Sequence, residues 1–297
     1  MRFNAQEITG SRVQVRYSVE LHYSLAGPAQ FLLNVHAAMT PQQVVVEEHF
    51  AVHPVCIHTV DADPATGNRI AAFSGQAGPL RAAYSAVVQV THLVADPGQL
   101  PGEEPTQLPV RTLRYLYPSR YCQADLVQQA AWDRFGTMPR GYAQVAAVRD
   151  WVEAGLRFAP GVSSTTTSVL DTLRDGAGVC RDFAHVMIAY CRALNYPARF
   201  VTGVDYGAAA ELGPQDFHAY VEVFVGGAWF IFDPTGISPV TGLIRIGTGR
   251  DAADVSFATI FGPVQTGTPL VAIAADSDAA NGILEPAVTK LAVSTAN

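Results

Sequence analysis

Long apolar runs, a leader segment and a cysteine framework are all missing from this chain of 297 residues. Its apolar runs are far shorter than the roughly 18 residues that indicate a membrane span. The first residues, 1–7, contain no positively charged stretch followed by an apolar one, so no signal peptide is indicated. The four cysteines (Cys56, Cys122, Cys180 and Cys191) are too few and too scattered for a disulfide scaffold, and no Cys-x-x-Cys pair offers zinc ligands. These absences predict a soluble, reduced, cytoplasmic protein.

Positive charge is also scarce. Lysine and arginine number 19 against 26 acidic residues, which gives a formal net charge of −7. Without basic clusters, neither nucleic acid nor an anionic membrane is expected as the main partner. Apolar residues make up 49% of the chain and charged residues only 15%, a composition that can bury a large core and is far from that of disordered chains. The length favours two domains.

The first hundred residues have the pattern of β-strands. Apolar and polar residues alternate along 13–25, which is the period of a half-buried strand. Shorter strand-like stretches follow at 31–37, 43–52, 55–60, 69–73 and 83–94, with turn signals between them. This pattern predicts a β-sandwich-like domain over 1–110. Proline, glycine and acidic residues crowd 96–109, as is typical of an interdomain linker.

After residue 118 the apolar spacing becomes helical. Helices are predicted at 121–135, 142–158 and 180–194, with a shorter one ending at residue 174. Strands are predicted at 198–204, 217–225 and 228–233. The fold class is therefore α+β, with a second domain over 111–265. The last segment, 266–297, has little period and is interpreted as a C-terminal extension on the surface.

Cys180 has the sequence context of a reactive cysteine. It follows a Gly-x-Gly turn and begins a strongly periodic helix. Unpaired backbone N–H groups and the positive end of the helix dipole meet at such a position, and both favour the nucleophilic thiolate. The alternative is a buried structural cysteine. Cys191, in the middle of the same apolar stripe, is expected to be such a core residue.

His218 and Asp233 are brought together by hairpin register. Gly226–Gly227 has the composition of a two-residue hairpin turn, which pairs Val225 with Ala228. In that register His218 lies diagonally from Asp233 on the same face of the sheet. A carboxylate beside an imidazole fixes the tautomer of the ring and stabilises its charged form. An ordinary surface ion pair is the alternative, and a slip of one residue would separate the two side chains.

Four stretches together resemble the transglutaminase-like superfamily. They are Gly-Val-Cys-Arg-Asp-Phe-Ala-His at 178–185, Pro-Ala-Arg-Phe-Val-Thr-Gly at 197–203, His-Ala-Tyr-Val-Glu at 218–222, and the segment 229–235 with its Phe-Asp-Pro-Thr ending. The most similar branch is the bacterial one of candidate cysteine proteases with a β-rich N-terminal domain. The resemblance implies a papain-like α+β core in which the cysteine begins a helix packed against an antiparallel sheet.

The resemblance also assigns roles. It makes Cys180 the nucleophile, His218 the general base and acid, and Asp233 the group that orients the histidine. The reaction implied is hydrolysis of peptide or isopeptide amides in a protein or peptide substrate, through a thioester and without a cofactor or metal. Transfer to an amine instead of water, a catalytically silent binding module on the same fold, and a structural assembly subunit are the alternatives. The substrate's identity, the role of the N-terminal domain and the oligomeric state are left open.

Two supporting roles near Cys180 are expected. The oxyanion formed during acyl transfer needs the backbone N–H of Cys180 and a second donor. The candidates for that donor are Thr165, Thr166 and Thr167 on the preceding loop. Asp182 is expected to cap the start of the helix, which is a structural role.

Three other motifs are interpreted without function. Three histidines and Cys56 lie within 49–58, but Pro54 interrupts the strand, so no metal site is expected. The acidic stretch 61–68 lacks the glycine and the closing glutamate of a calcium loop and predicts a hairpin turn instead. Gly-x-Gly-x-x-Ala at 247–252 matches a dinucleotide fingerprint, but no βαβ unit surrounds it.

Overall fold

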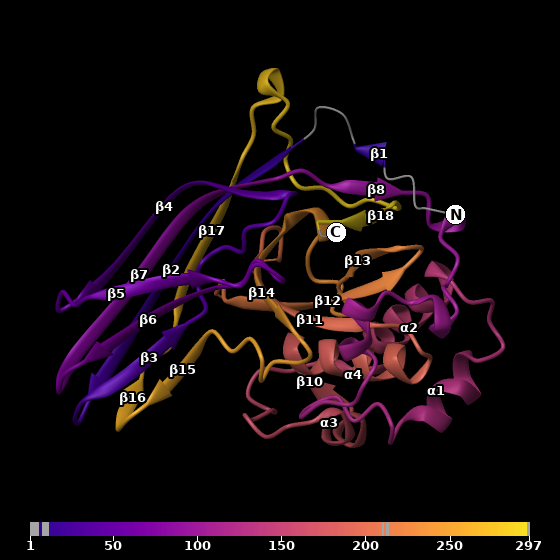
Figure 1. The fold of residues 1–297 in the computed structure, drawn as a ribbon, viewed down its shortest axis with the longest axis horizontal. Coiled ribbons are helices and arrows are strands. Elements are labelled where there is room, and N and C mark those ends of the chain that lie inside the picture. The colour runs from indigo at the N-terminus through magenta and orange to yellow at the C-terminus, as the bar shows by residue number, and fades with distance from the viewer. Residues whose placement is uncertain (1–5, 8–11, 210, 212–213, 296–297) are drawn as a thin grey trace.

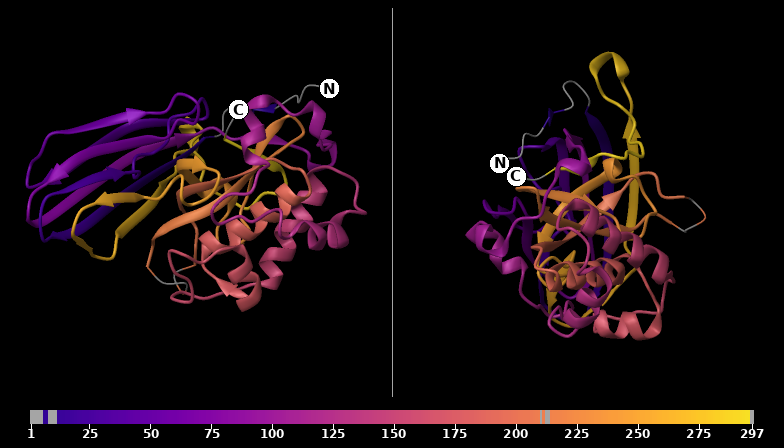
Figure 2. Two further views of the ribbon diagram at one scale, coloured as in Figure 1. Left: turned by 60° about the horizontal axis from the view of Figure 1, so that its bottom comes forward. Right: turned by 90° about the vertical axis from the view of Figure 1, so that its right-hand side faces the viewer.

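The computed structural model describes residues 6–7, 12–209, 211 and 214–295. Its chain has the α+β class expected from the sequence, with a β-rich N-terminal region beside a core of helices and an antiparallel sheet (Figures 1 and 2). In the part of the chain that is described, no helix is long and apolar enough to cross a membrane.

Two sheets enclose the core of the β-rich region. One has the order β15-β3-β6-β5, and the other has the order β16-β2-β7-β4 with β17 also beside β2. Every second side chain of β2 is buried, because alternate residues of a strand point to opposite faces. The strands that the N-terminal residues supply are β2 (Val13–Leu25), β3 (Ala29–Leu33), β4 (Gln43–His53), β5 (His58–Ala62), β6 (Arg69–Gly75) and β7 (Gly78–Val90).

The predicted and observed strands differ most around β7. The turn between the predicted strands 69–73 and 83–94 is shorter than expected, because β6 ends at Gly75 and β7 begins at Gly78. Pro79 pairs with Ser24 near the beginning of the strand, where proline is tolerated. The predicted strand 83–94 is broken after Val90, and β8 (Leu93–Ala95) instead joins a small sheet with β1 (Gln6–Glu7) and β18 (Ala292–Ser294).

After the core, the chain returns to the N-terminal sheets. β15 (Ala258–Phe261) pairs with β3, while β16 (Val264–Thr266) and β17 (Leu270–Asp276) pair with β2. Within segment 266–297, β17 therefore joins the sheet of β2 and β18 joins the small sheet of β8, a feature absent from the interpretation of this segment as a surface extension. The side chains of β16 and β17 are mostly exposed or half-buried, so these two strands lack a clear apolar period. The division at residues 110 and 265 stays a prediction.

The second region is built around a four-stranded antiparallel sheet with the order β13-β12-β11-β14. Its strands are β11 (Ala198–Asp205), β12 (Phe217–Val225), β13 (Ala228–Phe232) and β14 (Leu243–Gly249). Helix α4 (Cys180–Ala193) packs on one face of this sheet, with α1 (Gln128–Phe135), α2 (Tyr142–Gly155) and α3 (Val169–Asp175) around it. A parallel bridge joins β9 (Arg157–Phe158) to β10 (Ala177–Gly178) just before α4.

The helix predicted at 121–135 begins only at Gln128. The backbone of Tyr121 explains the difference, because both of its polar groups have partners outside a helix. Its N–H donates to the Asp251 carboxylate at 2.9 Å, and its carbonyl accepts from Val169 N–H at 3.0 Å. These tertiary hydrogen bonds replace the ladder that a helix would need.

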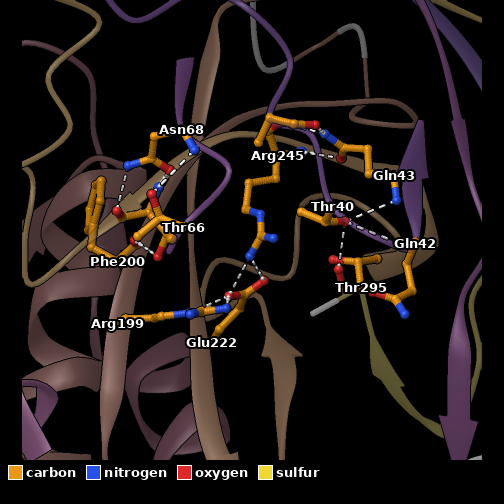
Figure 3. A network of polar contacts seen from close by, with 12 residues as sticks. Thr40, Gln42, Gln43, Thr66, Asn68, Arg199, Phe200, Glu222, Arg245 and Thr295 are labelled. Carbon is orange, nitrogen blue, oxygen red and sulfur yellow. Dashed lines mark hydrogen bonds and ion pairs between the residues drawn. The ribbon is translucent and has the colours of Figure 1, made fainter. Parts of the chain in front are cut away.

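Strand β14 is the edge of the core sheet, and two amide side chains from the N-terminal region pair with it (Figure 3). Gln43 accepts from the N–H of Arg245 at 2.9 Å and donates to its carbonyl at 2.7 Å. Asn68 accepts from the N–H of Thr248 at 2.8 Å and donates to its carbonyl at 2.9 Å. The two side chains thus satisfy edge groups that would otherwise be open to another strand.

A buried ion cluster continues from this junction into the sheet (Figure 3). Glu222 on β12 accepts from Arg199 at 2.6 Å and from Arg245 at 3.2 Å, and its side chain is fully buried. The Arg199 guanidinium also stacks on Trp229, 4.1 Å from the ring centroid. The cluster links the strand β14 at the junction to the strand that carries His218.

Replacing Gln43 with alanine should destabilise the protein by roughly 3 kcal/mol. The Gln43 side chain is buried and makes three hydrogen bonds, two to Arg245 and one to the carbonyl of Ala38. Its loss takes these partners from the N–H of Arg245 and the carbonyl of Ala38, while the carbonyl of Arg245 keeps its bond from Ala38 N–H. Urea unfolding measures the change. The exposed Gln129→Ala is the control and should shift the free energy of unfolding by less than about 0.5 kcal/mol. Equal effects of both variants would contradict the role given to the junction.

Candidate active site

Cys180 is the first residue of α4, as the sequence predicts. The carboxylate of Asp182 accepts a hydrogen bond from Val179 N–H at 2.9 Å, which confirms the expected capping role of Asp182. Gly178 is required beside it, because a Cβ there would come within 2.7 Å of the Asp182 side chain. Cys180 is half-buried, whereas Cys191 and Cys122 are fully buried.

The hairpin register of the sequence analysis is confirmed. Val225 pairs with Ala228, and Val221 pairs with Phe232, across the Gly226–Gly227 turn. His218 Nε2 lies 3.1 Å from Asp233 Oδ2, and both side chains are 2% exposed.

His218 joins the other two candidate residues. Its Nε2 bonds to Asp233, and Cys180 lies close enough to the ring to interact with it electrostatically. Since Nε2 is occupied by the carboxylate, Nδ1 is the ring nitrogen that serves Cys180. The structure therefore brings together Cys180 from a helix, His218 from a strand and Asp233 from the end of the next strand.

Burial and charge act in opposite directions on this pair. Burial alone would lower the pKa of His218, but the charge of Asp233, the hydrogen bond to Asp233 and the contact with Cys180 raise that pKa well above its ordinary value. Burial alone would raise the pKa of Asp233, but the charge and hydrogen bond of His218 keep that pKa below its ordinary value. The pair is thus held as imidazolium and carboxylate.

Thr235 completes the surroundings of Asp233 and was not singled out from the sequence. Its N–H and its hydroxyl both donate to Asp233 Oδ1, at 2.9 and 2.7 Å. Asp233 can therefore give Oδ2 to His218 without leaving its other oxygen unpaired. The Asp-Pro-Thr sequence carried the signal, because an aspartate often accepts from the backbone two residues on.

The three candidate threonines lie on a loop beside the helix. The carbonyl of Thr165 accepts from the Tyr121 hydroxyl at 2.7 Å, and Thr166 N–H donates to the Ser164 hydroxyl at 3.3 Å. Their service as oxyanion donors stays a prediction.

The structure also describes the acidic stretch 61–68 and the histidines of 49–58, for which no function is expected. Asp63 accepts from Ala65 N–H at 2.9 Å and from the Thr66 hydroxyl at 2.6 Å, which confirms the predicted hairpin turn. Over residues 12–209, 211 and 214–295, no three histidine, cysteine, aspartate or glutamate side chains are grouped to hold a metal ion.

Three buried histidines predict a loss of stability in mild acid. Burial lowers the pKa of His36 and His92 to about 4 and that of His185 to about 3. In the unfolded chain these side chains have a pKa near 6.5. As the pH falls below about 6.5, the unfolded state therefore binds protons that the folded state does not bind, and the folded state loses stability. Each histidine should remove about 2 kcal/mol of folding free energy between pH 7.5 and pH 5.

Urea unfolding at the two pH values measures this loss. His36→Gln should reduce the difference between the two pH values by about 2 kcal/mol, since glutamine does not titrate. The exposed His49→Gln serves as the control. A free energy of unfolding that stays constant from pH 7.5 to pH 5 would show that these histidines are not buried in neutral form.

Two family models match the chain. The transglutaminase-like superfamily model matches residues 130–234, a range that contains Cys180, His218 and Asp233. The model of the bacterial transglutaminase N-terminal domain matches residues 13–100.

Individual proteins agree with these matches. A crystal structure from Cytophaga hutchinsonii, presented as a candidate cysteine protease, is 33% identical, covers 99% of each chain and superposes with a TM-score of 0.87. The uncharacterized protein ML0607 of Mycobacterium leprae is 30% identical over 146 residues, which are 48% of this chain. The matched part spans about half (52%) of that relative's length. The helix that begins at the cysteine and the sheet that carries the histidine agree with both family models. This chain therefore belongs to the transglutaminase-like superfamily.

Proposed function

We propose that the protein hydrolyses peptide or isopeptide amide bonds with Cys180, His218 and Asp233 acting as a catalytic triad. One observation carries the proposal. A buried histidine has one ring nitrogen 3.1 Å from a carboxylate and interacts electrostatically with a half-buried cysteine at the start of a helix. Nucleophile, base and orienting group in this order are the elements of nucleophilic acyl transfer.

The reaction begins from the charged pair, in which His218 Nδ1 holds the proton of the Cys180 thiol and the sulfur is a thiolate. The sulfur then attacks the amide carbonyl carbon, and the carbonyl electron pair moves to oxygen to form the tetrahedral oxyanion. When that intermediate collapses, the C–N bond breaks and His218 returns its proton to the leaving nitrogen. A thioester remains on Cys180. Water then attacks the thioester while His218 accepts its proton, which releases the acid and restores the thiolate and the imidazolium.

Asp233 acts through His218. Its negative charge favours the imidazolium that forms when Cys180 gives up its proton, and its bond to Nε2 directs Nδ1 toward the sulfur. The two bonds from Thr235 hold the carboxylate in this orientation.

Product analysis tests the proposal. The protein is incubated with a peptide mixture in H₂¹⁸O that also contains a primary amine, and the products are identified by mass spectrometry. We expect new carboxylates carrying ¹⁸O, and none when Cys180→Ala is used instead. Amine adducts in place of ¹⁸O-labelled acids would reassign the protein to amine transfer. The absence of both products would favour the silent binding module. The cytoplasmic location stays a prediction.

A further inference from the structure

The loop over 160–168 runs from β9 to α3 and is anchored at both of its ends. Just before it, Ala159 N–H donates to the carbonyl of Gly178 at 2.9 Å. Just after it, Val169 N–H donates to the carbonyl of Tyr121 at 3.0 Å. Gly178 lies two residues before Cys180, so the loop leaves β9 beside the start of the helix.

Arg181, the residue after Cys180, holds the middle of this loop. Its guanidinium donates to the carbonyl of Ser164 at 2.6 Å and pairs with Asp182 at 3.0 Å. Asp182 is buried and caps the helix through Val179. The orientation of Arg181 is therefore set by the same carboxylate that fixes the helix start, and the loop carbonyl is tied to that start through one side chain.

Tyr121 supplies a second tether next to the first. Its hydroxyl donates to the carbonyl of Thr165 at 2.7 Å, and its ring stacks on His185 of α4 with a centroid distance of 5.1 Å. The Arg181 guanidinium lies over the same Tyr121 ring, 5.8 Å from its centroid. Two neighbouring carbonyls of the loop are thus bound to groups fixed on the helix that carries the nucleophile.

The loop so held has an exposed surface without charge. Between Gly161 and Ser168 it contains only serine, threonine, valine and glycine. Val162 is 50% exposed, and Thr165 and Thr166 are also exposed. The hydroxyls can hydrogen-bond to the backbone of an extended peptide, and Val162 can contact its uncharged side chains. Because the four tethers already order the loop, it loses less conformational entropy when a peptide binds.

We propose that Arg181 is a positioning residue that holds the 160–168 loop as a fixed wall for the acyl part of a peptide substrate. This inference rests on the proposed function. It implies that Arg181 contributes to substrate binding and has little influence on the thiol chemistry, because the groups that act on the Cys180 thiol are His218 and Asp233.

Steady-state kinetics of Arg181→Ala on a peptide substrate tests the inference. We expect KM to rise about tenfold while kcat stays within about threefold, and the rate of Cys180 alkylation by iodoacetamide to stay unchanged. A large fall in kcat with an unchanged KM would overturn the wall role and favour the loop threonines as oxyanion donors. Arg181→Lys should recover part of the loss, since one ammonium can still reach the Ser164 carbonyl. Arg174→Ala is the matched control, because Arg174 is exposed and pairs with Asp171 and Asp175 of α3. Its kinetics should match those of the wild type.

Amide hydrogen exchange gives a readout that needs no turnover. In Arg181→Ala, the amides of 164–167 should exchange faster than in the wild type, and those of α4 should not. An unchanged KM, or unchanged exchange in the loop, would overturn the inference. So would a slowed alkylation of Cys180, which would show that Arg181 serves the helix start instead. A wild type that cleaves no peptide would refute the proposed function, and the wall role with it, even where exchange shows that Arg181 holds the loop.

Discussion

Replacing Cys180 with serine is expected to reduce amide hydrolysis by at least about a thousandfold. Serine keeps nearly the same shape, but its hydroxyl is far less acidic than a thiol, and the site offers a single histidine to take its proton. The thiol is half-buried at the start of α4 and interacts electrostatically with His218, and the change alters one atom of the site. The measurement is the kcat/KM of peptide cleavage together with the thermal unfolding temperature, which should stay within a few degrees of the wild type.

Cys56→Ser provides the matched control. Cys56 is the other free cysteine that is half-buried, and it lies in the N-terminal region, packed against the core of the two sheets. Its replacement should leave kcat/KM unchanged. Equal activity of the wild type and Cys180→Ser would mean that the cleavage arises elsewhere, and the triad would have to be abandoned.

Replacing Asp233 with asparagine is expected to reduce kcat by a factor on the order of 10² to 10⁴. Asparagine removes the charge that keeps the pKa of His218 high despite its burial, so the imidazolium formed during the reaction loses its stabilisation. The amide also offers His218 Nε2 a donor where the carboxylate offered an acceptor. This favours the tautomer with its proton on Nδ1, which cannot accept the proton of Cys180.

The pH profile distinguishes this effect from simple misfolding. Loss of the Asp233 charge should shift the pH range in which His218 is protonated to lower values, and the acid limb of Cys180 alkylation should change with it. Asp254→Asn is the control, since Asp254 is an exposed carboxylate that pairs with Arg250 at 2.8 Å. A full-activity Asp233→Asn enzyme would refute the orienting role.

Hairpin geometry made the site predictable. A two-residue Gly-Gly turn sets the register of β12 and β13, and that register alone places His218 beside Asp233. Cys180 could be recognised because a glycine-rich turn followed by a periodic apolar stripe locates a helix start. Local signals therefore sufficed wherever the relevant partners were close in sequence or joined by a short turn.

The features that could not be predicted depend on long-range contacts. Nothing local reveals that β17 pairs with β2, roughly 250 residues earlier, because an exposed edge strand needs little apolar period. The non-helical backbone at Tyr121 is likewise decided by Asp251, 130 residues away. The amides Gln43 and Asn68 read as ordinary polar residues, and only the folded chain shows them pairing with β14.

The junction also gives the N-terminal region a structural role. Its two amides cover the free edge of the sheet that carries His218, and the buried cluster of Arg199, Glu222 and Arg245 links that edge to β12. The site is therefore built on a sheet whose edge strand is completed by residues from the other end of the chain.

The pH dependence of Cys180 alkylation, in the wild type and in His218→Ala, tests the central claim most directly. Removing Cys56, Cys122 and Cys191 by mutation isolates the signal of Cys180. The account predicts fast alkylation of the wild type below pH 7 and a marked slowing in His218→Ala, since the imidazolium stabilises the thiolate. A slow rate that rises only near pH 8.5, the range of an ordinary thiol, with no effect of His218→Ala, would contradict it.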